Sequence, residues 1–179
     1  RRDHSSESFG KLSLPMGQLA FAVFAFSLAF AGPCRAQDED NRDARLTETK
    51  GEVTVYTADA PEGLPAEKDM PLETGDRVTT GGESSAEVGL DGAHLISLRS
   101  NSDFTLANVS KNGTEVKLAF GSLLAKIQKL LGTENFRVRT PTTVAAVRGT
   151  EFAVEAAENG EETHVGVFDE GKVLVGSDG

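Results

Sequence analysis

Two histidines are the first candidates for chemistry downstream of residue 36, because imidazole binds metals and transfers protons near neutral pH. His94 stands in the segment AHLISL and His164 in THVGVF. Neither belongs to an HxH or HExxH pattern, and no acidic segment has the spacing of an EF-hand loop. We therefore expect both histidines to lie on strand surfaces, and we predict neither a metal site nor a cofactor.

The serine and glycine patterns give no enzyme signature either. The chain contains no G-x-S-x-G segment, the nucleophile elbow of α/β-hydrolases. Residues 75–82 (GDRVTTGG) are rich in glycine, but they lack the Gly-Lys-Ser/Thr ending of a phosphate-binding loop and are typical of a turn. We expect a protein that is not an enzyme and has no catalytic residues.

One charged residue stands in unusual surroundings. Arg148 precedes Gly149 in the segment 140–156 (TPTTVAAVRGTEFAVEA), whose alternating residues predict a strand. An unbroken strand places Arg148 on the more apolar face beside Phe152, whereas a bulge at Gly149 turns it outward. We predict a largely buried Arg148 that ties adjacent strands together with Asp76 as its partner, because a buried guanidinium needs a carboxylate. The rival hypothesis is an exposed Arg148 that grips an anionic partner.

Composition limits the kinds of partner. The 179 residues have a formal net charge of -10, and the basic residues are scattered. Such a surface repels nucleic acid and anionic lipid, so we predict no nucleic-acid binding. Since Cys34 is the one cysteine, neither disulfides nor cysteine-bound metal can stabilise the fold. The protein must depend on its apolar core.

The N-terminal part has the pattern of an export signal. Residues 19–31 (LAFAVFAFSLAFA) form an uncharged apolar run that is short for a membrane span and typical of a secretory signal. Cleavage after Ala36 is expected, with an uncleaved signal anchor and a lipoprotein modified at Cys34 as alternatives. We predict a periplasmic or secreted bacterial protein with no membrane contact beyond the signal.

Three segments follow from this pattern. Residues 1–36 are expected to be the signal peptide region with an upstream extension. Residues 37–50 are polar and acidic and are predicted to be a disordered leader. Residues 51–179 are expected to form one β domain.

Within residues 51–179, short alternating segments are separated by turn signals, which predicts an all-β fold. The domain is expected to consist of short strands joined by tight hairpins, in a β-solenoid-like or sandwich-like arrangement. Asp91-Gly92 has the composition of a type I′ hairpin turn, and residues 58–71 are predicted to be a loop. Helix and strand are both compatible with residues 121–132, of which we favour a strand over 122–127 followed by a helical turn. The other predicted strands are 52–57, 76–80, 85–90, 93–98, 103–108, 114–120, 135–140, 150–156, 163–168 and 172–175.

Five phenylalanines are evenly spaced in this domain, at every sixteenth residue from Phe104 to Phe168. The spacing is compatible with stacked β-coils or successive hairpins of similar length. Coincidence explains it equally well, because the neighbouring positions repeat poorly.

Several motifs together resemble a known family. LETGDRV at 72–78, the hairpin around Asp91-Gly92 and the pair FRVRTP (136–141) and VRGTEFAV (147–154) are similar to the conserved pattern of FecR-type periplasmic domains. The resemblance covers roughly residues 51–175. The motif residues, which we expect to be structural, are Gly75, Asp76, Asp91, Gly92, Thr140, Pro141, Arg148, Gly149, Thr150 and Phe152.

The resemblance implies an extracytoplasmic, non-enzymatic β module. Archetypal FecR-type proteins relay the state of an outer-membrane iron–chelate transporter to a sigma factor through a cytoplasmic segment and a membrane helix. Here the resemblance extends to the domain alone, so we expect a binding or interaction module linked to envelope sensing, whose partner is an envelope protein or a glycan. The alternative is a structural envelope or matrix component that associates with itself.

Overall fold

The computed structural model describes residues 42–110, 112–131, 134–168 and 171–177. The chain divides into two compact units, Arg1–Gln37 and Asp38–Gly179, and every described residue belongs to the second. The predicted signal peptide therefore lies outside the described residues. Within the described part of the chain, no helix has the length and apolar character needed to cross a membrane.

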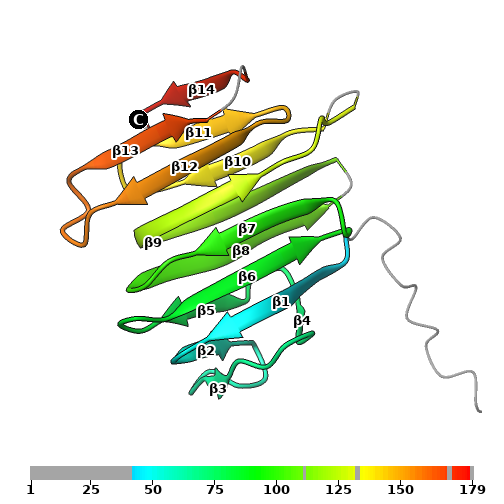
Figure 1. Cartoon of the computed structure of the whole chain (residues 1–179), viewed down its shortest axis with the longest axis vertical. Helices are drawn as coiled ribbons and strands as arrows, with labels where there is room; N and C mark the ends of the chain where they lie inside the picture. The colour runs from blue at the N-terminus through cyan, green and yellow to red at the C-terminus, as the bar shows by residue number, and fades with distance from the viewer. Residues whose placement is uncertain (1–41, 111, 132–133, 169–170, 178–179) are drawn as a thin grey trace, which may run out of the picture. The chain divides into compact units, whose positions relative to one another are not determined.

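The described residues form fourteen strands and no helix (Figure 1). Most are short, and the longest, β9, is a continuous strand of 14 residues. In chain order they are β1 (Ala44–Lys50), β2 (Val53–Tyr56), β3 (Leu64–Pro65), β4 (Pro71–Leu72), β5 (Arg77–Thr80), β6 (Ser85–Leu90), β7 (His94–Leu98), β8 (Ser102–Ser110), β9 (Gly113–Lys126), β10 (Phe136–Arg139), β11 (Val144–Val147), β12 (Glu151–Ala156), β13 (Thr163–Val167) and β14 (Val173–Gly176).

The strands form two layers that share β9. One layer, here sheet A, has the order β3-β2-β5-β8-β9-β10-β11-β14, and the other, sheet B, has the order β4-β1-β6-β7-β9-β12-β13. The first half of β9 pairs with β8 in sheet A, and the second half pairs with β7 and β12 in sheet B. Every pair is antiparallel except β9 with β10. The all-β prediction is confirmed: the fourteen strands form one curled sheet whose two layers are joined through β9.

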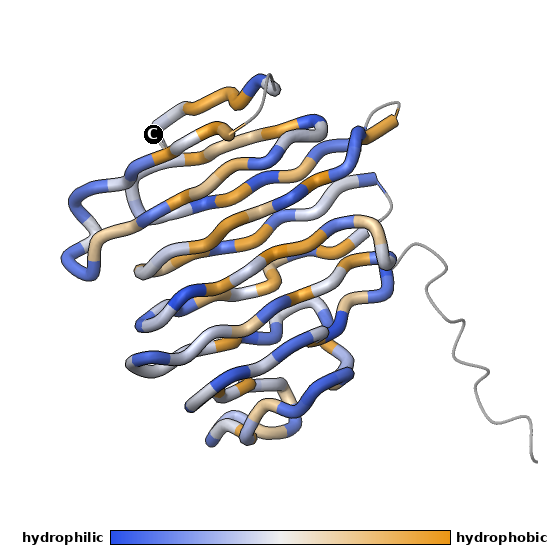
Figure 2. The backbone as a smooth tube through the Cα atoms, in the orientation of Figure 1, coloured by the Kyte–Doolittle hydropathy of each residue, from blue (hydrophilic) through white to orange (hydrophobic). Residues whose placement is uncertain are grey.

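The core lies between the two layers. Buried and more exposed residues alternate along most strands, and most of the buried side chains are apolar. Hydrophobic and hydrophilic residues alternate accordingly along the tube in Figure 2. Phe136 of sheet A meets Phe152 of sheet B edge to face, with ring centroids 6.2 Å apart. Aromatic pairs of this geometry add to the stability gained from burial. The evenly spaced phenylalanines do not share one environment, since Phe104 is buried and Phe168 is exposed.

The prediction of a disordered leader over residues 37–50 is wrong for residues 44–50. These residues form β1, which pairs with β6 from Ala44 opposite Leu90 to Lys50 opposite Ser85. The buried Ala44 and Leu46 alternate with polar residues, and two apolar positions are too few to predict a strand from sequence. Pairing with β6 therefore stabilises a strand that the local sequence alone does not predict.

Two other segments differ from expectation. Residues 127–131 form no helical turn, because their backbone amides bond to a neighbouring segment instead: Ile127 N donates to Thr150 O, and Leu130 N donates to Arg148 O. The predicted loop 58–71 contains the two-residue strand β3 and the first residue of β4. Both strands are at the edge of their sheets, where proline is tolerated.

Candidate functional site

Asp76 organises a turn and does not reach Arg148. Its buried carboxylate accepts a hydrogen bond from Glu73 N at 2.8 Å, and Gly75 N donates to Leu106 O at 2.7 Å. Strands β8, β9 and β10 lie between β5, which follows Asp76, and β11, which precedes Arg148. The predicted pairing of the two residues is therefore wrong.

Asp91 and Gly92 form the turn between β6 and β7. Both have positive φ angles, 52° and 63°, and Ala93 N donates to Leu90 O at 3.1 Å. Two positive φ values at the central residues define the predicted type I′ turn. These residues fix the register of the hairpin.

Thr140 and Pro141 begin the connection between β10 and β11. Thr140 is buried, and its hydroxyl accepts a hydrogen bond from Thr143 N at 3.0 Å. The Thr163 hydroxyl, at the start of β13, lies 2.8 Å from the Thr140 hydroxyl and 2.8 Å from that of Thr142. The threonines therefore join this turn of sheet A to a strand of sheet B.

Arg148 is exposed, so the prediction of a buried Arg148 is wrong. The chain bends at Gly149, whose φ is +117°, and passes from β11 in sheet A to β12 in sheet B. The alternation of buried residues shifts by one at the bend. The odd-numbered Ala145 and Val147 are buried before it, and the even-numbered Thr150 and Phe152 are buried after it. The bend turns Arg148 toward solvent. This is the orientation expected from the sequence if Gly149 interrupts the strand.

Gly149 also lets two backbones approach closely. A Cβ on this residue would lie 2.5 Å from the Cα of Lys129, inside any real contact distance. On either side of this close contact, the backbone amide of Ile127 donates to the carbonyl of Thr150, and the amide of Leu130 donates to the carbonyl of Arg148. A glycine is required here by both the φ angle and the packing.

His94 is buried rather than exposed on a strand surface, which corrects the expectation from sequence. Its Nδ1 accepts a hydrogen bond from Gln128 N at 3.1 Å, which requires the neutral ring. Burial lowers the pKa of His94, and the nearby Arg42 lowers it further. Arg42 is itself held by Asp91 at 3.5 Å and Glu134 at 3.3 Å, so this cluster connects the first described residue to the sandwich. His164 is exposed, as expected.

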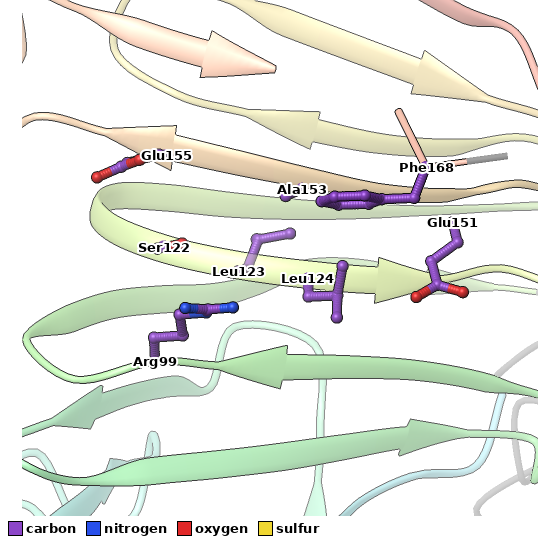
Figure 3. Close-up of a pocket in the computed structure, with 8 residues that line it drawn as sticks. All are labelled: Arg99, Ser122, Leu123, Leu124, Glu151, Ala153, Glu155 and Phe168. Atoms are coloured by element: carbon purple, nitrogen blue, oxygen red, sulfur yellow. The ribbon is translucent and has the colours of Figure 1, made fainter. Parts of the chain in front are cut away.

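A groove with apolar and charged lining residues lies on the outer face of sheet B. Its volume is about 420 Å³. Figure 3 shows Phe168 beside Ala153, with Arg99 across the groove from them and Glu151 and Glu155 at opposite ends. Ser122, Leu123 and Leu124 complete the lining.

The strand register explains why a groove forms there. Ser97 of β7, Leu124 of β9, Ala153 of β12 and Gly166 of β13 are directly opposite one another across four strands. Three of these four outward residues are small, so this row lies lower than the rows beside it. One neighbouring row contains Lys126 and Glu151, and the other contains Ser122, Glu155 and His164. Leu124 and Ala153, which line the groove, therefore lie low between the rows of Glu151 and Glu155.

The groove walls offer charge and an exposed ring. The guanidinium of Arg99 has no partner among the described residues, and 66% of Phe168 is exposed. Lys126 Nζ lies 3.8 Å from Glu151 Oε2, a loose and exposed ion pair. Charges of both signs thus flank an apolar floor.

The spacing of the two carboxylates does not suit hydrolysis of a glycosidic bond. Glu151 and Glu155 are four residues apart on one strand, which separates their Cα atoms by about 13 Å. Glycosidases hold their two carboxyl groups roughly 5–9.5 Å apart, whereas these two lie at opposite ends of the groove (Figure 3). Among the described residues, no group of three or more His, Cys, Asp and Glu side chains could hold a metal ion.

The FecR protein family model matches residues 76–174, which is more than half of the chain. The chain belongs to the FecR family. Comparison with curated proteins and with solved structures gives no match. FecR proteins are generally regulatory or signalling proteins rather than enzymes, and they are typically associated with the bacterial envelope.

The FecR match includes every residue that lines the groove, yet sequence reasoning did not find this site. Its residues come from β9, from β12 and from the residues that follow β7 and β13, and all except the buried Leu123 are ordinary outward positions of their segments. The one available signal was Phe168, the last of the evenly spaced phenylalanines.

Two other hollows lie on sheet A. One, of about 330 Å³, includes Tyr56, Thr74 and Arg77, and one of about 210 Å³ includes Asn108, Asn135 and Arg137. Neither has an exposed phenylalanine, and Arg77 of the first is bound to Asp103. The groove on sheet B is therefore the stronger candidate for recognition.

Proposed function

We propose that this FecR-family chain is a non-enzymatic binding module of the bacterial envelope, exported by its N-terminal segment, and that the groove on sheet B receives its partner. The observation that carries the proposal is the exposed Phe168 facing the unpaired Arg99 across an apolar floor. Aromatic and arginine side chains dominate the binding energy of protein interfaces, particularly when they can be desolvated together. A solvent-exposed ring has no stabilising role in the free domain.

The partner that fits this groove best is an extended segment of an envelope protein. The floor offers Leu124 and Ala153 to an apolar side chain, while Arg99 and Glu155 on the walls offer one charge of each sign. A polypeptide can supply an apolar residue together with both complementary charges, whereas a neutral glycan uses only the ring and the polar groups. Binding would report the state of that protein, which agrees with a sensing role.

Capture from an envelope extract tests the proposal. The unit Asp38–Gly179 contains the whole described core cluster and can be used as bait. Wild-type bait should retain a defined protein that the double variant Phe168→Ala/Arg99→Glu does not retain. Lys117→Glu, an exposed charge reversal on the outer face of sheet A, is the matched control and should retain it. Equal retention by all three baits would contradict the groove as the binding site.

A structural component that associates with itself is the second candidate function. The observation in its favour is the exposure of apolar residues on the edge strand β14, where Leu174 is 75% exposed and Val175 is 58% exposed. An assembly of this kind grows with protein concentration. Sedimentation velocity over a concentration series separates it from a module that stays small.

A further inference from the structure

The two ends of the sandwich differ in how their edge strands are protected. At one end, the edge strands β3 and β4 have two residues each and contain Pro65 and Pro71. Short strands and prolines prevent further strand pairing. At the other end, β13 and β14 have five and four residues, and in the described chain each pairs with a single neighbour. Figure 1 shows β13 and β14 together at that end.

The core is also uncovered at the end formed by β13 and β14. Val167 pairs with the buried Phe152 and Val175 with the buried Ala145, so both side chains point between the layers. Even so, Val167 is 42% exposed and Val175 is 58% exposed. Apolar side chains that point into a core and still meet water indicate a surface that another element covers.

Neither edge strand carries the charges that usually prevent edge-to-edge pairing. Thr163–Val167 contains one titratable residue, His164, and Val173–Gly176 contains none. Natural edge strands are normally guarded by lysine, proline or inward charges. Self-pairing here brings no like charges of these two strands together, although the chain as a whole has a net charge of -10.

We propose that two copies of the domain pair through β13 and β14 around one two-fold axis normal to the sheets. Such an axis places β13 antiparallel to its symmetry mate in sheet B and, in the same step, β14 antiparallel to its mate in sheet A. A second copy therefore completes both edges at once and covers Val167 and Val175, whereas a single added strand completes only one. Because the β3 and β4 end is blocked, the assembly closes as a dimer instead of growing into a fibre.

The dimer also changes the groove. The groove lies beside the edge strand β13, since Ala153 on its floor pairs with Gly166 of that strand and Phe168 follows the strand. A symmetry mate at this edge extends sheet B, so the two grooves open toward each other across the axis. The inference stands independently of the proposed function, since an isolated monomer could still bind through its own groove.

Sedimentation equilibrium of the unit Asp38–Gly179 tests the proposal, and the expected result is a reversible dimer. Val175→Lys should raise the dimer dissociation constant by at least about tenfold, because charges are then forced together at the interface. Since Val175 is 58% exposed in the single domain, the variant should still unfold cooperatively. Leu64→Lys, at the blocked end where Leu64 is 41% exposed, is the matched control and should leave the dimer intact.

Cysteine cross-linking provides a second readout, because Cys34 is the one cysteine of the chain and lies outside this unit. Residues near a two-fold axis face their own copies, so either His164→Cys or Gly166→Cys should give a disulfide-linked dimer under mild oxidation. Leu64→Cys should remain monomeric on a denaturing gel. A monomer at all concentrations, a polymer, or a dimer indifferent to Val175→Lys would each overturn the proposal.

Discussion

The outer faces of the two sheets use their polar side chains differently. On sheet A, Arg77 donates to Asp103 from Nε at 2.9 Å and lies over the Tyr56 ring at 4.7 Å, while Arg139 Nε lies 3.3 Å from Glu115. These contacts connect adjacent strands. On sheet B, Arg99 has no partner among the described residues, and Phe168 is exposed.

We interpret this difference as one between side chains that stabilise the fold on sheet A and side chains that serve the recognition proposed for sheet B. Asp103 is only 8% exposed, so its pairing with Arg77 satisfies a carboxylate that would otherwise be costly to bury. No such requirement fixes Arg99 or Phe168, and their contacts remain available to a partner. Substitutions on the two faces should therefore differ in kind: loss of stability on sheet A and loss of binding on sheet B.

The largest effect is expected where the chain crosses between the faces. Gly149→Ala should lower the free energy of unfolding by more than about 3 kcal/mol, since a strained φ alone costs of order 1–3 kcal/mol and the added Cβ meets the Lys129 backbone. Because the bend at Gly149 places β12 on sheet B, the groove should be lost with it. Chemical denaturation measures the change.

Two other glycines provide matched controls for Gly149→Ala. Gly92 has a φ of +63° with open space around a Cβ, so Gly92→Ala should cost only about 1 kcal/mol. Gly166 has neither a positive φ nor a neighbour within 4 Å, so Gly166→Ala should be nearly neutral. Equal losses in all three variants would mean that close packing at Gly149 is unimportant.

A pair of arginine variants compares the faces directly. Arg77→Ala should destabilise the domain by about 1–2 kcal/mol, at the lower part of the range for hydrogen bonds to charged groups because Arg77 is partly exposed. Arg99→Ala should change stability by less than about 0.5 kcal/mol, as is usual for surface substitutions. Urea unfolding of both variants gives the comparison, and a larger loss for Arg99→Ala would reverse it.

Acid should weaken the fold through His94. Burial holds the pKa of His94 in the folded state below its ordinary value near 6.5. The unfolded chain therefore binds the proton more readily, so stability is complete above about pH 6.5 and falls as the pH drops toward the folded-state pKa. Denaturation midpoints at about pH 7.5 and 5.5 should differ more for the wild type than for His94→Gln.

The exposed His164 provides the control for this pH effect. His164→Gln should retain the pH dependence that arises from His94, since the substitution leaves the His94 ring and its contacts in place. A wild-type dependence that survives in His94→Gln and disappears in His164→Gln would show that burial of His94 is not the cause.

An effect on stability as small as that of Arg99→Ala is expected at Arg148. The exposed guanidinium makes no contact that the fold requires, so Arg148→Ala should shift the free energy of unfolding by less than about 0.5 kcal/mol. The neighbouring Gly149 should be far more sensitive than Arg148. A loss above about 3 kcal/mol for Arg148→Ala, the range for breaking a buried pair, would restore the structural role.

Alternation of apolar residues was sufficient to predict most strands and the all-β fold. The segment SAEVGL at 85–90 can be predicted from its own residues because it has a clear apolar face. The Asp91-Gly92 turn can be predicted because these residue types favour a type I′ turn. β1 could not be predicted, since its pairing with β6 depends on residues about forty positions away. Because Gly149 could interrupt the strand, the sequence allowed either a buried or an exposed Arg148. The alternation of an unbroken strand favoured the buried orientation, which is wrong.

The groove could not be predicted because it depends on strand register. Ala153 is unremarkable in sequence, and it becomes part of the floor only when β9 and β12 place it opposite Leu124. The family-like residues were more visible, but Asp76, Gly92 and Thr140 lie in turns that stabilise the scaffold. A sequence motif of this kind identifies the fold more readily than the binding surface.

Site-specific photo-cross-linking in the native cell tests the recognition role of sheet B most directly. A photoreactive phenylalanine analogue at position 168 replaces an exposed ring with another ring, and the same analogue at the exposed Lys117 probes sheet A. The account predicts a covalent adduct with one defined envelope protein from position 168 and none from position 117. Adducts from position 117 alone, or no adduct from position 168 in a correctly folded and exported protein, would contradict it.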